Sequence, residues 1–411
     1  MSMTATEKIL ARGAGKDSVK PGDIVEVAVD RAMIHDNNAA LTIKNFDMIY
    51  SSKVWAPEKV FFFIDHHTPS TSTKAVKHQN LMRKFAREHA IRNFYDCGSG
   101  ISHVVMLEND FARPGEIVVG TDSHTTGQGA SGSFATGIGA TEMAAVLVKG
   151  TVWLKVPGTI RINGTGTLPK WANARDLVSL VLARFGPDGA NYRAVEFGGE
   201  AFDGMSQDER IMTCVMSMEM GAKNALFVRD VADAPAYESV VYFDADSVKP
   251  MIAVPYLPTN AVLAEEVAKK KIRVDQAAIA SCAGALLSDL EIAAEILNGR
   301  TVAEGTRLLV IPATRRIYND ALSRGYLQVL SRAGAIISSP GCGACGGHDV
   351  GILAEGEVCI SSSTRNMPGR MGAGGIVYLG SSATVAASAV TGYITDPREV
   401  LPDGGRHDNA A

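Results

Sequence analysis

Long apolar runs are missing from this sequence. Its most apolar stretch, residues 130–148, is interrupted by two serines, two threonines, a glutamate and three glycines. A membrane-spanning helix needs roughly 18 almost uninterrupted apolar residues, so none is expected. The first 25 residues mix charged with apolar side chains and lack the apolar core of a secretory signal. We therefore expect a cytoplasmic protein.

Excess positive charge is also missing. The 40 lysines and arginines are balanced by 44 aspartates and glutamates, which gives a net charge of -4. A protein whose main partner is nucleic acid or an anionic lipid surface usually carries a marked basic excess. Neither nucleic acid nor a membrane is therefore expected as a partner.

Cysteine is scarce, with six residues in 411. In a long chain without a secretory signal, metal binding or catalysis is a more frequent use of cysteine than a disulfide framework. Cys97, Cys214 and Cys359 show no ligand spacing, so we expect them to be small core residues.

The chain length predicts two to four domains, with tentative boundaries near residues 157 and 245. Short β-branched, aliphatic or aromatic runs have the length of buried strands, namely residues 24–29, 60–64, 116–119, 307–311 and 335–337. Helical patterns lie between them, including residues 74–91 and 287–297, the second with Ser288 and Glu291 as a possible capping box. This alternation predicts α/β layers with partly parallel sheets.

Polar segments follow three of these runs. Residues 65–69 follow the second run, residues 120–124 follow the third, and residues 340–342 come shortly after the last. Open α/β sheets bind their ligands beyond the carboxyl ends of the strands. The sequence therefore predicts a shared cleft built from several strand ends.

Cys342 and Cys345 form a Cys-x-x-Cys pair on a glycine-rich segment, and Cys282 follows an apolar run further upstream. Reduced thiolates in such a setting are typical ligands of iron–sulfur clusters or zinc, and a redox-active pair is a further alternative. A fourth protein ligand is missing from the pattern. In a catalytic site, three protein ligands leave one metal position open for substrate or water.

Acidic residues stand beside histidines in two of the strand-end segments. Asp65 precedes His66, Asp122 lies two residues before His124, and His103 lies on a third polar segment. A carboxylate that orients an imidazole and raises its basicity suits proton transfer to a leaving hydroxyl group. A structural role is the alternative for each histidine alone, but three such segments favour an active site.

Arg365 and Arg370 place two guanidinium groups around a turn. Guanidinium forks match carboxylates with two hydrogen bonds, so the pair could bind an anionic substrate. Surface salt bridges are the alternative.

Together these residues resemble the aconitase superfamily, and in particular the large subunits of the 3-isopropylmalate dehydratase type. The resemblance covers nearly the whole chain. Its most specific parts occur in the family's order, at residues 120–124, 281–282, 340–345, 363–366 and 369–370.

The resemblance implies one [4Fe-4S] cluster per chain, held by Cys282, Cys342 and Cys345, with one iron that no protein group ligates. It also implies roles for individual residues. Asp65 and His66 correspond to the pair that helps protonate the leaving oxygen, and Ser123 to a substrate-site residue beside the cluster. The remaining matches are to residues lining the water and carboxylate side, to an active-site glutamate and to substrate- or structure-holding arginines: His103, Asp122, His124, Glu219, Arg365 and Arg370.

The family's fold implies three α/β/α domains with mixed, largely parallel sheets around a central cleft. Here they would span residues 1–157, 158–244 and 245–411. Single-chain aconitases add a fourth, swivelling domain that carries a serine base, and no such segment is found in this chain. We therefore expect a heterodimer in which a separate small subunit carries that domain, and a large subunit that is inactive alone.

The implied activity is a hydro-lyase acting on a hydroxy di- or tricarboxylic acid. The subunit type favours 3-isopropylmalate and hence leucine biosynthesis, while homoaconitate, 2,3-dimethylmalate, citramalate and maleate are alternatives. An iron-sensing RNA-binding protein and a zinc-stabilised scaffold are remote ones. Four residues depart from the family's usual polar ones and leave the substrate open: Val215, Ala283, Gly284 and Thr364.

Overall fold

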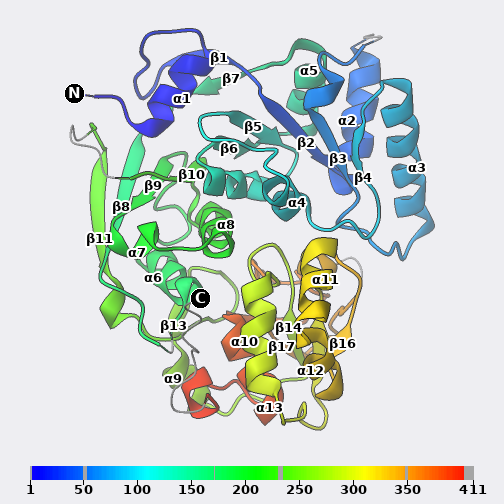
Figure 1. The fold of residues 1–411 in the computed structure, drawn as a ribbon, viewed down its shortest axis with the longest axis vertical. Helices are drawn as coiled ribbons and strands as arrows, with labels where there is room; N and C mark the ends of the chain where they lie inside the picture. The colour runs from blue at the N-terminus through cyan, green and yellow to red at the C-terminus, as the bar shows by residue number, and fades with distance from the viewer. Residues whose placement is uncertain (1, 50–52, 171, 230–234, 348–349, 402–411) are drawn as a thin grey trace. The chain divides into compact units, whose positions relative to one another are not determined.

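The computed structural model describes residues 2–49, 53–170, 172–229, 235–347 and 350–401. The chain forms two compact units, each built from two separate stretches (Figure 1). The first unit comprises residues 1–164 and 188–243, and the second comprises residues 165–187 and 244–411. Within the described ranges, no helix combines the length and the apolar character needed to cross a bilayer.

A five-stranded sheet forms the centre of the first unit, in the order β4-β3-β2-β5-β6 with every neighbouring pair parallel. Its strands are β2 (Arg31–His35), β3 (Val60–Phe63), β4 (Asn93–Tyr95), β5 (Ile117–Gly120) and β6 (Phe134–Gly137). The helices that connect or flank them are α2 (Asp36–Met48), α3 (Thr73–Glu88), α4 (Ser102–Glu108) and α5 (Ala140–Lys149).

Alternate residues of these strands face two different cores. Ile34 and Phe62 pack with apolar residues of α2, α3 and α5. Met33, Phe61 and Phe63 pack instead with α4. Because side chains alternate along a strand, a parallel sheet covered on both faces needs apolar residues at successive positions. This explains the uninterrupted apolar run of β3, all four residues of which are buried.

A four-stranded sheet in the order β10-β9-β8-β11 and a two-stranded antiparallel sheet complete the strands of the first unit. They consist of β8 (Thr159–Thr165), β9 (Ala194–Gly198), β10 (Asn224–Phe227) and β11 (Ser239–Asp244), and of β1 (Ile24–Ala28) and β7 (Thr151–Lys155). The other helical segments of this unit are α1 (Ala5–Gly13), α7 (Glu200–Asp203), α8 (Gln207–Met216), and the 3-10 turns η1 (Pro57–Lys59), η2 (Ser123–Ser131) and η3 (Ser217–Met220).

The second unit contains a seven-stranded sheet in the order β13-β12-β18-β17-β14-β15-β16. Its last five strands are mutually parallel, whereas β12 runs antiparallel to both of its neighbours. The strands are β12 (Met251–Ala253), β13 (Ala261–Leu263), β14 (Gln276–Ile279), β15 (Arg307–Val310), β16 (Ile336–Ile337), β17 (Val358–Ser361) and β18 (Ile376–Gly380).

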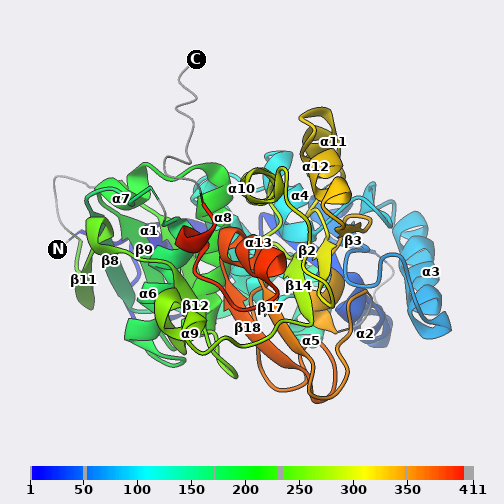
Figure 2. The same cartoon turned by 90° about the horizontal axis from the view of Figure 1, so that it is seen from below.

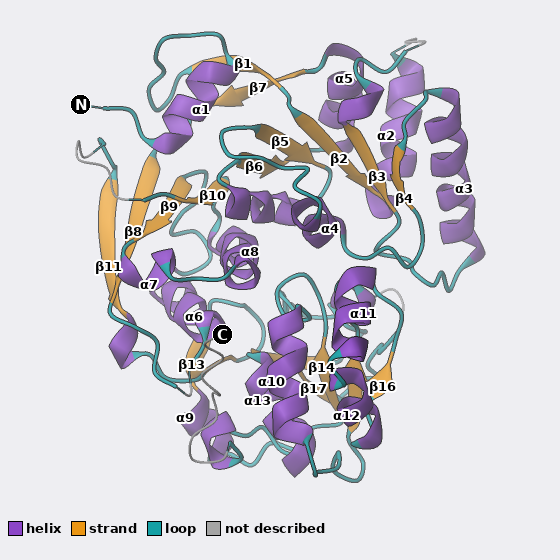
Figure 3. Ribbon diagram, viewed as in Figure 1, coloured by secondary structure: helices purple, strands orange, loops and turns teal. Residues whose placement is uncertain are grey.

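Helices pack against this sheet and against one another. α13 packs on β14, β17 and β18, and α10 contacts α11, α12 and α13 (Figures 2 and 3). α6 lies between β8 and β9 in the sequence, but it packs on β12 and β13. The helical segments of this unit are α6 (Ala174–Phe185), α9 (Ala264–Ala268), α10 (Leu287–Leu297), α11 (Arg315–Ser323), α12 (Tyr326–Arg332), α13 (Ser382–Thr391), η4 (Ala245–Ser247), η5 (Gly343–Gly346) and η6 (Pro397–Glu399).

The predicted α/β fold with largely parallel sheets is confirmed, with three local corrections. The run at residues 335–337 is not a buried strand, because it forms only the two-residue edge strand β16, whose Ile336 is 54% exposed. The run at residues 24–29 is not a fully buried strand, because β1 pairs only with β7 and alternates exposed with buried residues. The helix at residues 287–297 is present, but its cap is not Ser288 with Glu291. Its N-cap is Leu286, whose amide donates to the Asp289 carboxylate.

The three-domain division stays a prediction. The three larger sheets fall within the three predicted segments, but α6 belongs to the compact unit of the last one. The end of the third predicted segment, residues 402–411, lies outside the described residues.

Asp176 is a buried carboxyl group that joins α6 to the seven-stranded sheet of the second unit. Its Oδ1 accepts a hydrogen bond from the Met251 amide at 2.9 Å, and its Oδ2 accepts one from the Asn173 amide at 3.0 Å. Burial raises the pKa of Asp176 to about 7 even though these amides favour the charged form. Between roughly pH 4 and pH 7 the folded chain therefore holds a proton that the unfolded chain releases, so this group's contribution to stability falls as pH rises.

We expect Asp176→Asn to be less stable than the parent at pH 5 by roughly 1–2 kcal/mol. The new side-chain NH2 group cannot accept a hydrogen bond, so it would leave one of the two backbone N–H donors without an acceptor. The deficit should shrink towards pH 8, since only the parent loses stability through this titration. Thermal unfolding midpoints from pH 5 to 8 measure it, with Asp320→Asn on the exposed side of α11 as control. A deficit that grows with pH would contradict the assignment.

Candidate active site

Three neighbouring strands of the first unit's sheet end in charged or imidazole side chains. His35 is the last residue of β2, Asp65 follows β3 by two residues, and Asp122 follows β5 by two residues. β2 lies between β3 and β5, and all three strands are parallel. Their carboxyl ends therefore meet at one edge of the sheet, which is where open α/β sheets bind their ligands.

Asp65 and His66 form a carboxylate–imidazole pair at this edge, in which Asp65 is buried and His66 is partly exposed. His66 donates from Nδ1 to Asp65 Oδ1 at 2.7 Å, and the Ser102 amide donates to Asp65 Oδ2 at 2.8 Å. Burial alone would raise the pKa of Asp65, but the charge and hydrogen bond of His66, helped by His35 and Ser102, hold it well below its usual range. The carboxylate thus stays charged and holds Nδ1, which leaves Nε2 of His66 as the atom able to exchange a proton.

Several imidazole rings surround the carboxylate of Asp122. His103 donates from Nε2 to Asp122 Oδ1 at 3.0 Å, and the His124 amide donates to the same oxygen at 2.7 Å. Nε2 of His66 lies 3.8 Å from Asp122 Oδ2. Burial opposes the charge of Asp122, yet the hydrogen bond and charge of His103, together with His124 and His35, keep its pKa well below the usual value.

Glu219 joins this group from a different part of the chain. It lies on η3, directly after α8, and its Oε1 accepts a hydrogen bond from His124 Nε2 at 3.1 Å. α8 packs against η2, the turn that carries His124. Val215 of α8 lies at this contact, because a Cβ on Gly127 would come within 2.7 Å of its side chain. Ser123 is the first residue of η2 and is half-buried.

His35 and Asp36 belong to the same cluster but were not predicted. The His35 ring stacks on that of His66 with centroids 4.4 Å apart, and its Nε2 donates to the Thr121 carbonyl at 3.0 Å. The Asp36 carboxylate accepts hydrogen bonds from the amides of His66 and His67. Burial, with the charge of His66, lowers the pKa of His35. The missed signal was a third pairing of a histidine with an aspartate at a strand end, since β2 ends at His35 and Asp36 follows it.

The three predicted cluster cysteines all lie in the second unit, in loops beyond parallel strands. Cys282 comes three residues after β14. Cys342 directly precedes η5, the turn that follows β16, and Cys345 lies within η5. Cys282 and Cys345 are buried and Cys342 is partly exposed. Thr364, beyond β17, places its hydroxyl oxygen 3.5 Å from Cys345 Sγ. Since β17, β14, β15 and β16 are parallel neighbours, these loops share one edge of the sheet.

The donor set of these loops bears on which metal group they suit. It consists of three thiols, those of Cys282, Cys342 and Cys345. Thiolates are the usual ligands of iron–sulfur groups. The residues present therefore fit an iron–sulfur group.

The other cysteines have different surroundings. Cys214 and Cys359 are buried, as predicted, and burial raises the pKa of Cys359 to about 12. The prediction was wrong for Cys97, which is exposed and lies beside the guanidinium of Arg83.

Arg365 and Arg370 are both partly exposed, on the segment that follows β17. A turn at this point brings the Arg370 amide to the Met367 carbonyl at 3.1 Å. The Nε of Arg370 is buried and makes no hydrogen bond within the described part of the chain. A buried donor of this kind suits an anionic ligand.

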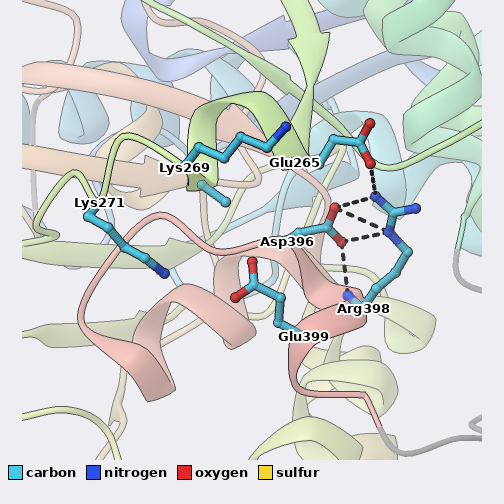
Figure 4. Close-up of a pocket in the computed structure, with 7 residues that line it drawn as sticks. Glu265, Lys269, Lys271, Asp396, Arg398 and Glu399 are labelled. Carbon is cyan, nitrogen blue, oxygen red and sulfur yellow. Dashed lines mark hydrogen bonds and ion pairs between the residues drawn. The ribbon is translucent and has the colours of Figure 1, made fainter.

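Figure 4 shows an open hollow in the second unit, with a volume of about 510 Å³. Lys271 precedes β14, so the hollow lies towards the amino end of that strand, away from the cysteine loops at its carboxyl end. Within it, Arg398 pairs with Asp396 at 2.6 Å and with Glu265 at 2.8 Å. None of the predicted site residues lines it.

The profile of the aconitase family (aconitate hydratase) matches residues 7–233 and 228–392. The 3-isopropylmalate dehydratase large subunit 1 of Methanopyrus kandleri is 42% identical, over 98% of this chain and 100% of its own length. The 3-isopropylmalate dehydratase large subunit of Nitratiruptor sp. is 40% identical, over 97% of this chain and 100% of its own. With these matches over nearly its full length, the chain belongs to the aconitase family.

Proposed function

We propose that this chain is the large, [4Fe-4S]-containing subunit of a hydro-lyase that removes and re-adds water on 3-isopropylmalate. The observation that carries this proposal is the 42% identity to a 3-isopropylmalate dehydratase large subunit along its entire length. The two strand-edge groups described above support it, since thiol ligands and carboxylate–imidazole pairs are the kinds of group that an iron–sulfur hydro-lyase would use.

Cys282, Cys342 and Cys345 would hold the cluster. When bound, the cluster would supply a Lewis acid to the departing hydroxyl group through its one iron without a protein ligand. Ser123 would contribute to the substrate site. Thr364, whose hydroxyl lies at Cys345 Sγ, would donate a hydrogen bond to the thiolate and so tune the cluster's potential.

Asp65 and His66 would protonate the leaving oxygen. Asp65 holds Nδ1 of His66 and would stabilise the imidazolium, so Nε2 would be the atom that delivers the proton. His35, stacked on the same ring, limits its rotation.

The second carboxylate group would act on the water and on the substrate carboxylate. Asp122 holds His103 through Nε2, and Glu219 holds His124 through Nε2. Arg365 and Arg370 would bind the carboxylates of the substrate, because guanidinium groups recognise them with paired hydrogen bonds. A small subunit with the swivelling domain would supply the serine base.

Substrate assays with 3-isopropylmalate, homoaconitate, 2,3-dimethylmalate, citramalate and maleate test the choice of substrate. We expect the highest kcat/KM for 3-isopropylmalate. A preference for another acid would keep the hydro-lyase class and replace the substrate.

Cys345→Ser should remove the cluster. The parent, purified without oxygen, should contain about four irons and four sulfides per chain and show a broad visible charge-transfer band. The variant should lose the band and most of the iron, whereas Cys97→Ser, which changes an exposed cysteine, should keep both. Zinc in place of iron in the parent would reject the cofactor.

Asp122→Asn should lower kcat by roughly 10²-fold or more, because His103 loses its charged partner. Iron content should stay unchanged. The matched control is Asp96→Asn, since Asp96 follows β4 at the same sheet edge but pairs with Arg83. Unchanged kcat in the Asp122 variant would exclude a role in the reaction.

The isolated, cluster-loaded chain should show almost no turnover, and addition of a small subunit from a family relative should restore it. Steady-state rates across a titration of the small subunit measure this. Full turnover by the chain alone would reject the proposed division of the site.

A further inference from the structure

Arg175 of α6 reaches two loops of the second unit. Its side chain is 6% exposed. Nη1 donates to the Ala283 carbonyl at 3.3 Å and to the Ser362 carbonyl at 3.1 Å, while Nη2 donates to the Ser363 carbonyl at 2.7 Å. One guanidinium group therefore bridges backbone oxygens that lie far apart in the sequence.

These two loops also carry cluster-site groups. Ala283 directly follows Cys282, and Ser363 directly precedes Thr364, whose hydroxyl lies 3.5 Å from Cys345 Sγ. In the first loop, Arg175 therefore binds the residue next to a predicted cluster ligand. In the second loop, it binds the residue next to Thr364, which contacts another predicted ligand.

The loops touch through their backbones at Gly284. A Cβ at this position would lie 2.2 Å from the Ser362 carbonyl oxygen, so a larger residue would force the loops apart. Ser362 Oγ donates to the Gly284 carbonyl at 2.7 Å and accepts from the Ala280 amide at 3.1 Å. The contact leaves the carbonyls of Ser362 and Ser363 turned towards α6.

Several carbonyl oxygens pointing into a buried space repel one another and need donors. A guanidinium fork can serve several oxygens in fixed directions, which a lysine ammonium cannot do as well. Gly284 and Arg175 therefore act together, the first by allowing close approach and the second by satisfying the oxygens that this approach buries.

We propose that Arg175 is a positioning residue for the iron–sulfur cluster, holding the loops of Cys282 and Thr364 in their ligand-presenting arrangement before the cluster binds. The inference rests on the proposed function, because only a cluster-binding chain needs these loops as ligand carriers. The loop arrangement itself is a property of the cluster-free chain. Arg175 acts through the loops and contacts no reacting group in this role.

The experiment compares the parent with Arg175→Lys and Arg175→Gln, using Arg184→Gln, an exposed arginine of the same helix, as matched control. In cluster-free protein under reducing conditions, the alkylation rates of Cys282 and Cys345 by iodoacetamide are followed by peptide mass spectrometry. Loss of two or three hydrogen bonds should raise these rates by about tenfold or more in the Gln variant, and less in the Lys variant. Cys359, buried in β17, should keep its slow rate.

A second readout uses the cluster-loaded protein. Iron release to a chelator, measured by loss of visible absorbance, should be several-fold faster in Arg175→Gln than in the parent and the Arg184 control. Unchanged alkylation of Cys282 and Cys345 in a folded variant would overturn the inference, and so would an equal rise at Cys359, which indicates general loosening. A parent that binds no iron–sulfur cluster would reject the proposed function instead, while the alkylation result would still decide whether Arg175 orders the loops.

Discussion

Parallel strand order is the constraint on which the rest of this chain's chemistry depends. In the first unit, β3, β2 and β5 are parallel neighbours, so three separate strand ends deliver Asp65, His35 and Asp122 to one edge. In the second unit, the loops beyond β14, β16 and β17 deliver the cysteines and Thr364 in the same way. Each position needs only a polar residue directly after an apolar strand. The sheets convert that local pattern into clusters.

Electrostatics then decides the charge of the carboxylates among the histidines of the first unit. Burial alone would protonate Asp65 and Asp122, and both instead have lowered pKa values because imidazoles donate to them. Asp176 is the contrasting case, since two backbone amides without a cationic hydrogen-bond partner do not overcome its burial. Asp65 and Asp122 therefore stay charged because histidines donate to them, and the histidines are oriented in return.

The four residues expected from the sequence to depart from the family pattern lie at contacts within the fold. Val215 packs where α8 meets η2, Gly284 lies against the Ser362 backbone, and Ala283 offers its carbonyl to Arg175. Thr364 keeps a hydroxyl at Cys345. Val215 and Gly284 thus stand at close packing contacts, and in the cysteine loops backbone carbonyls and a buried guanidinium take part in the polar network.

The sequence alone determined the alternation of strands and helices, the apolar character of the doubly covered strands, and the residue types placed just beyond them. Such features depend on neighbours within a few positions, which explains why Asp65, Asp122 and the three cysteines could be singled out. Glu219 was identified through family resemblance, because it stands in a 3-10 turn 95 residues from its partner His124 and shows no local pattern. His35 was overlooked for lack of a recognised strand before it. Only the tertiary structure decided which imidazole pairs with which carboxylate, and that Arg175 serves the cysteine loops, because these pairings depend on distances between segments that no local sequence pattern encodes.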